Sequence, residues 1–290
     1  MDSIMDSLED FFADMLRDSI KGMLENMFST MDSVVLYASN ELEKNPESWN
    51  SGIFSLIREI SINAIAPIAV IILTLVVCYD FLSRFMDKSS RDMDIEVVAK
   101  LCLKLSIGIY LLNHCFDFTM GVFAMGQKAV TYATGTILGT TAHMDFNLYS
   151  TFESQMEKLS IGGLFGVLLI IIIMEIISVV SVILIMVITT SRMIEIYIYT
   201  SAAPIPFATL TNREWSNVGN NYIKNLFALS FQAFFMMVVV GLYNALINNI
   251  VVSETESITW TLSKCMGLSV ILVLMLWKCG STSKSIFNAM

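Results

Sequence analysis

The sequence predicts an all-α, polytopic membrane protein with about five transmembrane helices, and two observations lead to that prediction. Of the 290 residues, 55% are hydrophobic and only 15% are charged, with a mean hydropathy of +0.68. Residues 161–190 form the longest apolar run, in which Glu175 is the only charge. A hydrocarbon core of about 30 Å needs roughly 20 apolar residues at about 1.5 Å each. This run is therefore long enough to cross a bilayer.

The first 60 residues are expected to form an extracytoplasmic arm ahead of a transmembrane domain at 61–290. Within residues 1–35, apolar side chains recur at helical spacing and acidic ones fall between them, which predicts a long amphipathic helix. Helices that lie on anionic lipid prefer lysine and arginine on their polar face, so docking on protein is favoured. Packing on its own bundle and contact with a partner both remain open.

Five apolar segments are the expected spans, at about residues 61–82, 97–123, 161–190, 222–250 and 258–277. Pro204 and Pro206 follow the third span in a stretch that is still apolar. Proline removes a backbone donor and restricts the residue before it, so the helix should end or kink near Ala203. We call residues 192–220 the elbow. The polar connection at 126–160 contains GTILG, a candidate short interfacial helix.

The basic residues predict the orientation of the bundle. Cytoplasmic loops of membrane proteins carry an excess of lysine and arginine. The cations gather in three places, between spans one and two, between three and four, and after five: Arg84, Lys88, Arg91, Lys100, Arg192, Arg213, Lys224, Lys278 and Lys284. The alternate connections hold only Lys128 and Lys158. The prediction is N-out and C-in, with the elbow on the cytoplasmic side.

Three charged residues inside expected spans are candidates for an intramembrane polar site or conduit: Glu175, Lys104 and Asp117. A charge at the centre of a span costs at least ~2.5 kcal/mol and should face protein or water. Glu175 fits an ion or proton site, a ring of carboxylates in an oligomer, or a neutral glutamate hydrogen-bonded between helices. Lys104 and Asp117 are too far apart to pair on one helix, and both can snorkel towards membrane ends.

Gly162 and Gly166 have the GxxxG spacing that allows close helix packing. We expect no enzymatic activity and no cofactor, because the chain has no GxxxxGK[ST], HExxH or GxSxG motif. The five cysteines form no CxxC pair and are interpreted as small buried hydrophobes rather than metal ligands.

A long apolar helix ends in SRMIEIYIYTSAAPIPFATL and is followed by GNNYIKNLFALSFQAFF. In this pattern, residues 161–232 resemble the TrbL-type family of polytopic inner-membrane channel subunits of type IV secretion and conjugation machines. Its matching positions are Arg192, Ala202, Ala203, Pro204, Pro206, Phe207, Gly219, Tyr222, Lys224 and Gln232.

This resemblance implies a subunit that oligomerises in the bacterial cytoplasmic membrane and helps a protein-linked single DNA strand or an effector protein across it. ATPases and bitopic scaffold proteins would be its partners. On this hypothesis the elbow meets the ATPase or the substrate through Arg192, Pro204, Pro206, Arg213, Gly219 and Lys224. Two alternatives stay open, namely a small-molecule or ion permease with Glu175 as its coupling-ion site, and an assembly scaffold without a conduit.

Overall fold

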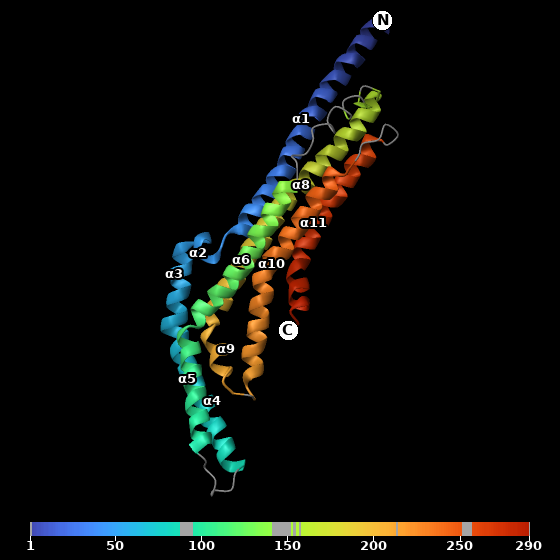
Figure 1. Cartoon of the computed structure of the whole chain (residues 1–290). Helices are drawn as coiled ribbons and strands as arrows, with labels where there is room; N and C mark the ends of the chain where they lie inside the picture. Colours follow the sequence, from blue (N-terminus) through green and yellow to red (C-terminus); the bar gives the residue numbers. More distant parts are fainter. Residues whose placement is uncertain are drawn as a thin grey trace. The chain divides into compact units, whose positions relative to one another are not determined.

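The computed structural model describes residues 2–87, 95–140, 152, 155–156, 158–212, 214–250 and 257–289, and every regular element in these ranges is a helix (Figure 1). In chain order the elements are α1 (Asp2–Glu43), α2 (Pro46–Trp49), α3 (Ser51–Glu59), the π-helix η1 (Ile60–Ile65), α4 (Ala66–Asp87), α5 (Ile95–Asn113), α6 (Cys115–Thr140), α8 (Ile161–Ala202), α9 (Pro204–Thr209), α10 (Ser216–Asn248) and α11 (Ile258–Ile286). The predicted all-α fold is confirmed.

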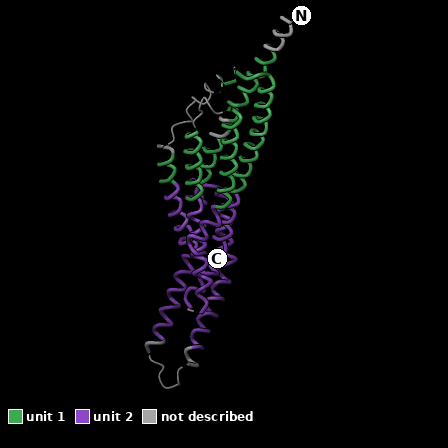
Figure 2. Tube along the Cα trace, turned by 90° about the vertical axis from the view of Figure 1, so that its right-hand side faces the viewer, with its two compact units in different colours: residues 1–42, 131–189, 235–278 green, residues 43–130, 190–234, 279–290 purple. Residues whose placement is uncertain are grey.

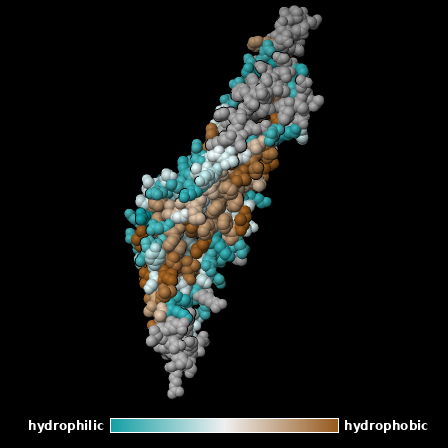
Figure 3. Space-filling view, in the orientation of Figure 1, coloured by the Kyte–Doolittle hydropathy of each residue, from teal (hydrophilic) through white to brown (hydrophobic). Residues whose placement is uncertain are grey.

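Among the described residues, four helical stretches are long and apolar enough to cross a membrane: Ser51–Ser83, Ile161–Ala202, Ser216–Ile247 and Ile258–Ile286. A fifth candidate is the pair Val98–Asn113 and Cys115–Ile137, whose two halves are bent by 62°. Large apolar side chains remain exposed on these helices, and hydrophobic residues cover much of the face in Figure 3. Soluble proteins rarely expose apolar surface on this scale, whereas a bilayer accepts it. The chain is a multi-pass membrane protein.

The first span begins earlier than expected, because α3, η1 and α4 follow one another without a gap from Ser51. Asn50 starts this helix with its side-chain oxygen, which accepts a hydrogen bond from the amide of Ile53 at 3.0 Å. Pro67 lies inside this continuous helical stretch. The π-helix just before it, in which the Ala66 amide donates to the Ser61 carbonyl, widens the turn that precedes the proline.

The second span is broken where one helix was expected. Helix α5 ends at Asn113 and α6 begins at Cys115, with His114 between them. Helix α6 then continues to Thr140, so GTILG is the end of a long helix and not a separate interfacial one. The rest of the expected polar connection lies largely outside the described residues. Neighbouring packing outweighs the weak helix preference of the glycines in this segment.

The chain divides into two compact units (Figure 2). Unit 1 comprises residues 1–42, 131–189 and 235–278, and its helical segments lie side by side in both ribbon views. One face of α1 is buried in this unit, through Leu16, Ile20, Leu24 and Met27. The predicted amphipathic helix is thus present, and it is longer than expected.

Unit 2 comprises residues 43–130, 190–234 and 279–290 and contains the elbow. Its main core combines side chains from α6, α8, α9 and α10: Cys115, Phe123, Met193, Ile196, Ala203, Phe207, Tyr222, Leu226 and Leu229. The end of α11 packs on α10, where the Ser283 hydroxyl donates to the Ala228 carbonyl. The ring of Phe287 lies 6.2 Å from that of Phe227 and 5.5 Å from that of Phe231, measured between centroids.

Candidate functional site: the proline elbow

The elbow forms because two prolines follow the end of α8. Helix α8 ends at Ala202, and Pro204 occupies the first turn of α9, where a missing amide hydrogen costs nothing. Thr209 closes this short helix by donating its hydroxyl hydrogen to the Pro206 carbonyl at 2.8 Å. Pro204, Phe207, Ala208 and Thr209 are all buried. The predicted break after the third span is therefore present, and it is built into the protein core.

The elbow packs against both α4 and α5. Ala208 joins a buried cluster with Ala69 and Leu73 of α4 and Leu112 of α5. On α5, a Cβ atom added at Gly108 would lie 2.7 Å from Cγ2 of Thr211 and 2.9 Å from Cδ1 of Leu73. The absence of a side chain at this glycine lets the three segments meet. The elbow consequently runs alongside α4 rather than beyond its end.

A buried asparagine holds the far end of the elbow. The side-chain amide of Asn212 donates to the Val76 carbonyl of α4 at 3.2 Å, and its oxygen accepts from the Glu214 amide at 2.8 Å. The side chain of Glu214 in turn forms a hydrogen bond with the Tyr79 hydroxyl of α4. These contacts fix the turn between α9 and α10 to the first span.

The start of α10 crosses the elbow closely. A Cβ atom at Gly219 would lie 2.5 Å from Cδ2 of Leu210 and 2.7 Å from the Pro206 carbonyl oxygen. One turn further, the Tyr222 hydroxyl donates to the Tyr199 carbonyl of α8 at 2.8 Å. The Tyr222 ring also contacts the Phe207 ring, with centroids 5.9 Å apart. Together these contacts set the angles between α8, α9 and α10.

A small cavity of about 140 Å³, lined by both polar and apolar side chains, lies where three backbone interruptions meet, namely η1, the α5–α6 break and the start of α9. Its lining includes Arg58, Ser61, Asn113, Asp117 and Pro204. At the α5–α6 break the His114 amide donates to the Tyr110 carbonyl at 3.1 Å, and the His114 carbonyl accepts from the Phe118 amide at 2.9 Å. Backbone irregularities at membrane depth are tolerated where they face protein or a cavity, and this cavity adjoins the break.

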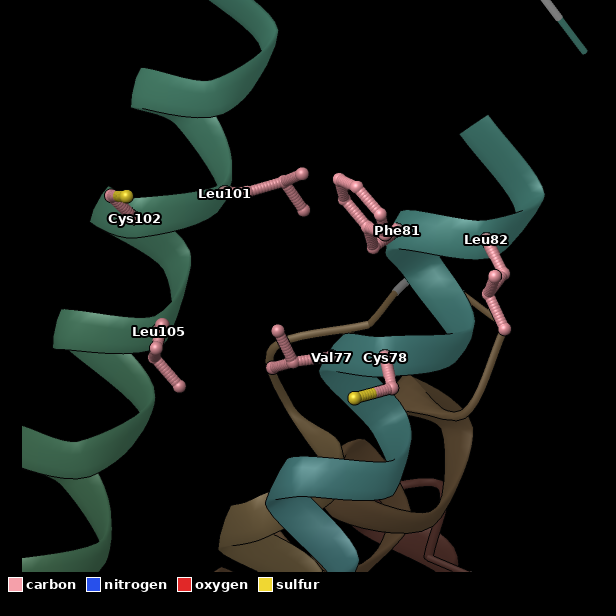
Figure 4. A pocket seen from close by; sticks show the side chains of 7 residues that line it. All are labelled: Val77, Cys78, Phe81, Leu82, Leu101, Cys102 and Leu105. Atoms are coloured by element: carbon pink, nitrogen blue, oxygen red, sulfur yellow. The ribbon is translucent and has the colours of Figure 1, made fainter. Parts of the chain in front are cut away.

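An apolar groove of about 430 Å³ separates α4 from α5 on the side towards residue 88 (Figure 4). Figure 4 shows the side chains of Leu101 and Phe81 pointing toward one another across it. Nearby, the Lys104 ammonium lies 3.0 Å from the Asp80 carboxylate, so a partly buried ion pair joins the two helices. The hairpin of α4 and α5 is thus held by Gly108 and by this ion pair.

The comparisons with known proteins identify the chain's relatives. The family model described as TrbL/VirB6 plasmid conjugal transfer like protein matches residues 31–204, which is more than half of the chain. The chain belongs to the TrbL/VirB6 family. No curated protein matches it. The match ends at Pro204, so the part of the resemblance at Gly219, Tyr222, Lys224 and Gln232 lies beyond it.

In this TrbL/VirB6 chain, the expected intramembrane charges lie in separate surroundings. Lys104 pairs with Asp80, whereas Asp117 lies 3.6 Å from Nδ1 of His114, the residue at the break just before its helix. The two residues therefore have different partners, as their spacing predicted. Glu175 lies half-buried in the first half of α8.

The cationic elbow residues of this family member also differ from one another. Arg192 is buried, its Nε has no hydrogen-bond partner among the described residues, and its electrostatic partner is Glu195. The Glu195 carboxylate accepts from the Lys284 ammonium of α11 at 3.2 Å. Lys224 is exposed on α10, and Arg213 lies outside the described residues. Arg192 thus belongs to a charge cluster with Glu195 and Lys284, while Lys224 is open to contact.

A further expectation concerns the packing role of Gly162 and Gly166. A Cβ at Gly162 or Gly166 would meet no atom within 4 Å in the part of the chain that the structure describes. Their role in helix packing stays a prediction. Gly108, by contrast, makes a close approach that the sequence analysis missed, because nothing in the α5 segment marks one glycine as a contact point.

Asn212 was also missed, although a sequence signal for it exists. An asparagine shortly after a proline-rich break commonly closes a turn with its side chain, and Asn212 does so with Glu214. Its bond to Val76 joins positions that are 136 residues apart. Only the folded structure reveals that partner.

Proposed function

We propose that the chain is a channel or scaffold subunit of a type IV secretion machine in the bacterial cytoplasmic membrane. In this role it oligomerises there and assists the passage of a DNA–protein or protein substrate. Membership of the TrbL/VirB6 family supports its place in conjugal transfer, and the apolar helices support its place in a membrane. Catalysis and energy supply belong to other subunits in this proposal, including ATPases, with bitopic scaffold proteins as further partners.

The elbow is the observation that carries the proposal. A break in a membrane helix is costly unless protein or a hydrated cavity satisfies its backbone groups. Here the break is buried against α4, α5 and α10 and adjoins the cavity whose polar lining includes Arg58 and Asp117. Broken helices that line cavities are the usual sites where membrane proteins handle polar cargo. We therefore assign the elbow and its cavity to the translocation step.

Partner contact at the elbow is assigned to Lys224 rather than to Arg192. Lys224 is exposed, so an ATPase or a passing substrate can reach its ammonium group. Arg192 is buried next to Glu195 on the same helix, and Glu195 in turn links α8 to Lys284 of α11. Replacing Lys224 with glutamine should lower transfer without lowering the amount of protein in the membrane. Replacing Arg192 should lower both.

The experiment that tests the proposal is DNA transfer from a donor strain that lacks this gene, with and without complementation. Assembly of the remaining machine is scored in the same cells. Loss of transfer that complementation restores supports the proposal. Unchanged transfer in the deletion strain would overturn it.

A permease with Glu175 as its coupling-ion site is the second candidate. It is favoured by the half-buried position of that carboxyl group in the longest apolar helix. Glu175→Gln separates the two candidates. It should abolish ion-coupled uptake into vesicles containing the purified protein if the permease reading is right, and should leave DNA transfer nearly unchanged if the secretion reading is right.

A further inference from the structure

The N-terminal helix α1 has two faces with different environments. At 100° per residue, the buried positions Leu16, Ile20, Leu24 and Met27 fall along one side of the helix. This side closes the core of unit 1. The opposite side carries Phe11 and Met15, followed one turn later by Asp18. Contact with the chain's own bundle therefore occupies one face of α1, and no described residue covers the other face.

The open face begins with a compact apolar cluster. Phe11 is 65% exposed, and Phe12 and Met15 are each 50% exposed. The rings of Phe11 and Phe12 contact each other edge to face, with centroids 6.2 Å apart. Because Phe11 and Met15 are one helical turn apart, they present a single surface together with the neighbouring Phe12. Two aromatic rings and a methionine are typical anchors of protein interfaces.

Charge indicates what this cluster contacts. Asp14 lies beside it with its carboxylate largely exposed, and Asp18 is exposed one turn further on the same side. Arg17 is bound to Asp14 at 2.8 Å, and its side chain is only 30% exposed. Anionic lipid would be repelled by these carboxylates. A protein segment with basic side chains would be attracted by them.

We propose that Phe11, Phe12 and Met15 form an anchor for a different protein, which receives them in an apolar groove bordered by lysine or arginine. The three side chains enter the groove as the i, i+1 and i+4 positions of a helix. Asp14 and Asp18 face the basic border and fix the orientation. This inference concerns unit 1 alone and does not rest on the proposed function.

The test places a photo-crosslinking benzophenone side chain at position 15 in cells that produce the full chain together with its neighbouring genes. The expected result is one discrete adduct with a different protein, whose crosslinked peptide has lysine or arginine near the attachment point. Ser33, on the same exposed side of α1 but far from the cluster, is the matched control position and should give no such adduct.

The anchor and its charges are then varied separately. Phe11→Ala with Phe12→Ala should lower the adduct yield at least tenfold, and so should Asp14→Lys with Asp18→Lys. Both variants should keep the normal amount of protein in the membrane, because the changed side chains are exposed or half exposed. An adduct with lipid or with a second copy of the chain would overturn the proposal. So would an adduct that both double variants leave unchanged.

This readout is independent of DNA transfer. If the deletion strain transfers DNA normally but the adduct forms as expected, the proposed function fails and the anchor stands. If transfer is lost in the deletion strain but no adduct forms, the anchor fails and the proposed function stands.

Discussion

Gly219→Ala tests the packing of the elbow directly. The added Cβ would lie 2.5 Å and 2.6 Å from the Leu210 side chain and 2.7 Å from the Pro206 carbonyl oxygen. The leucine can turn away, but the carbonyl belongs to the backbone of α9 and cannot move without shifting the elbow. Overpacking of this kind typically costs about 1–3 kcal/mol.

The destabilisation caused by Gly219→Ala is measured against a matched control variant. Alanine is favoured over glycine inside a helix by about 1 kcal/mol, which masks part of the cost of the clash. Gly121→Ala on α6 adds the same methyl group where no atom of the described chain lies within 4 Å. The difference between the two variants removes the helix preference and isolates the clash. We expect Gly219→Ala to be less stable than Gly121→Ala by about 1–3 kcal/mol.

The assay is thermal unfolding of the purified variants in one detergent, combined with the DNA transfer frequency of each. Leu210→Ala removes two of the three close atoms, so Gly219→Ala with Leu210→Ala should cost less than the sum of the single variants. If Gly219→Ala is as stable as Gly121→Ala, the close crossing of α10 over the elbow is refuted.

Three further substitutions test other contacts of the account. Asn212→Ala removes the buried hydrogen bond to the Val76 carbonyl, so the free energy of unfolding should fall by about 1 kcal/mol and the DNA transfer frequency should fall with it. If both values stay unchanged, this hydrogen bond does not hold the elbow. Phe287→Ala should destabilise the chain by about 1–3 kcal/mol in thermal unfolding, because the Phe287 ring packs on two rings of α10. Ile286→Ala is the control and should have little effect, because Ile286 is exposed. Equal effects of the two variants would contradict this packing. Glu175→Gln should leave the transfer frequency within a few-fold of the natural protein, and a complete loss would return the ion-site interpretation to first place.

The parts of the fold that follow from local chemistry were predictable from the sequence. Apolar length predicted the spans, and Pro204 with Pro206 predicted the break after the third one. The alternation of apolar and acidic residues predicted the helix of the first 35 positions. Each of these signals acts within a few helical turns, so one sequence is enough to detect it.

The contacts that hold the elbow could not be predicted, because they join distant segments. Neither proline nor glycine marks the break at His114, and Gly108 looks like any glycine in an apolar helix. Arg192 was expected to contact a partner from the cytoplasmic side, because lysine and arginine gather in cytoplasmic loops, yet it is buried beside Glu195. The elbow's place alongside α4 follows from these long-range contacts, whereas its placement on the cytoplasmic side stays a prediction.

Cysteine crosslinking tests whether the elbow lies beside the first span. A Cβ atom built on Gly108 would lie within 3 Å of both the Leu73 and the Thr211 side chains, so these two side chains are close to each other. In a variant without the native cysteines, Leu73→Cys with Thr211→Cys should crosslink rapidly in native membranes through a short bifunctional maleimide. Leu75→Cys with Thr211→Cys is the control, because Leu75 is exposed two residues further along the helix. Crosslinking of the Leu73 pair alone is the predicted result, and crosslinking of the Leu75 pair alone, or of neither, would contradict the account.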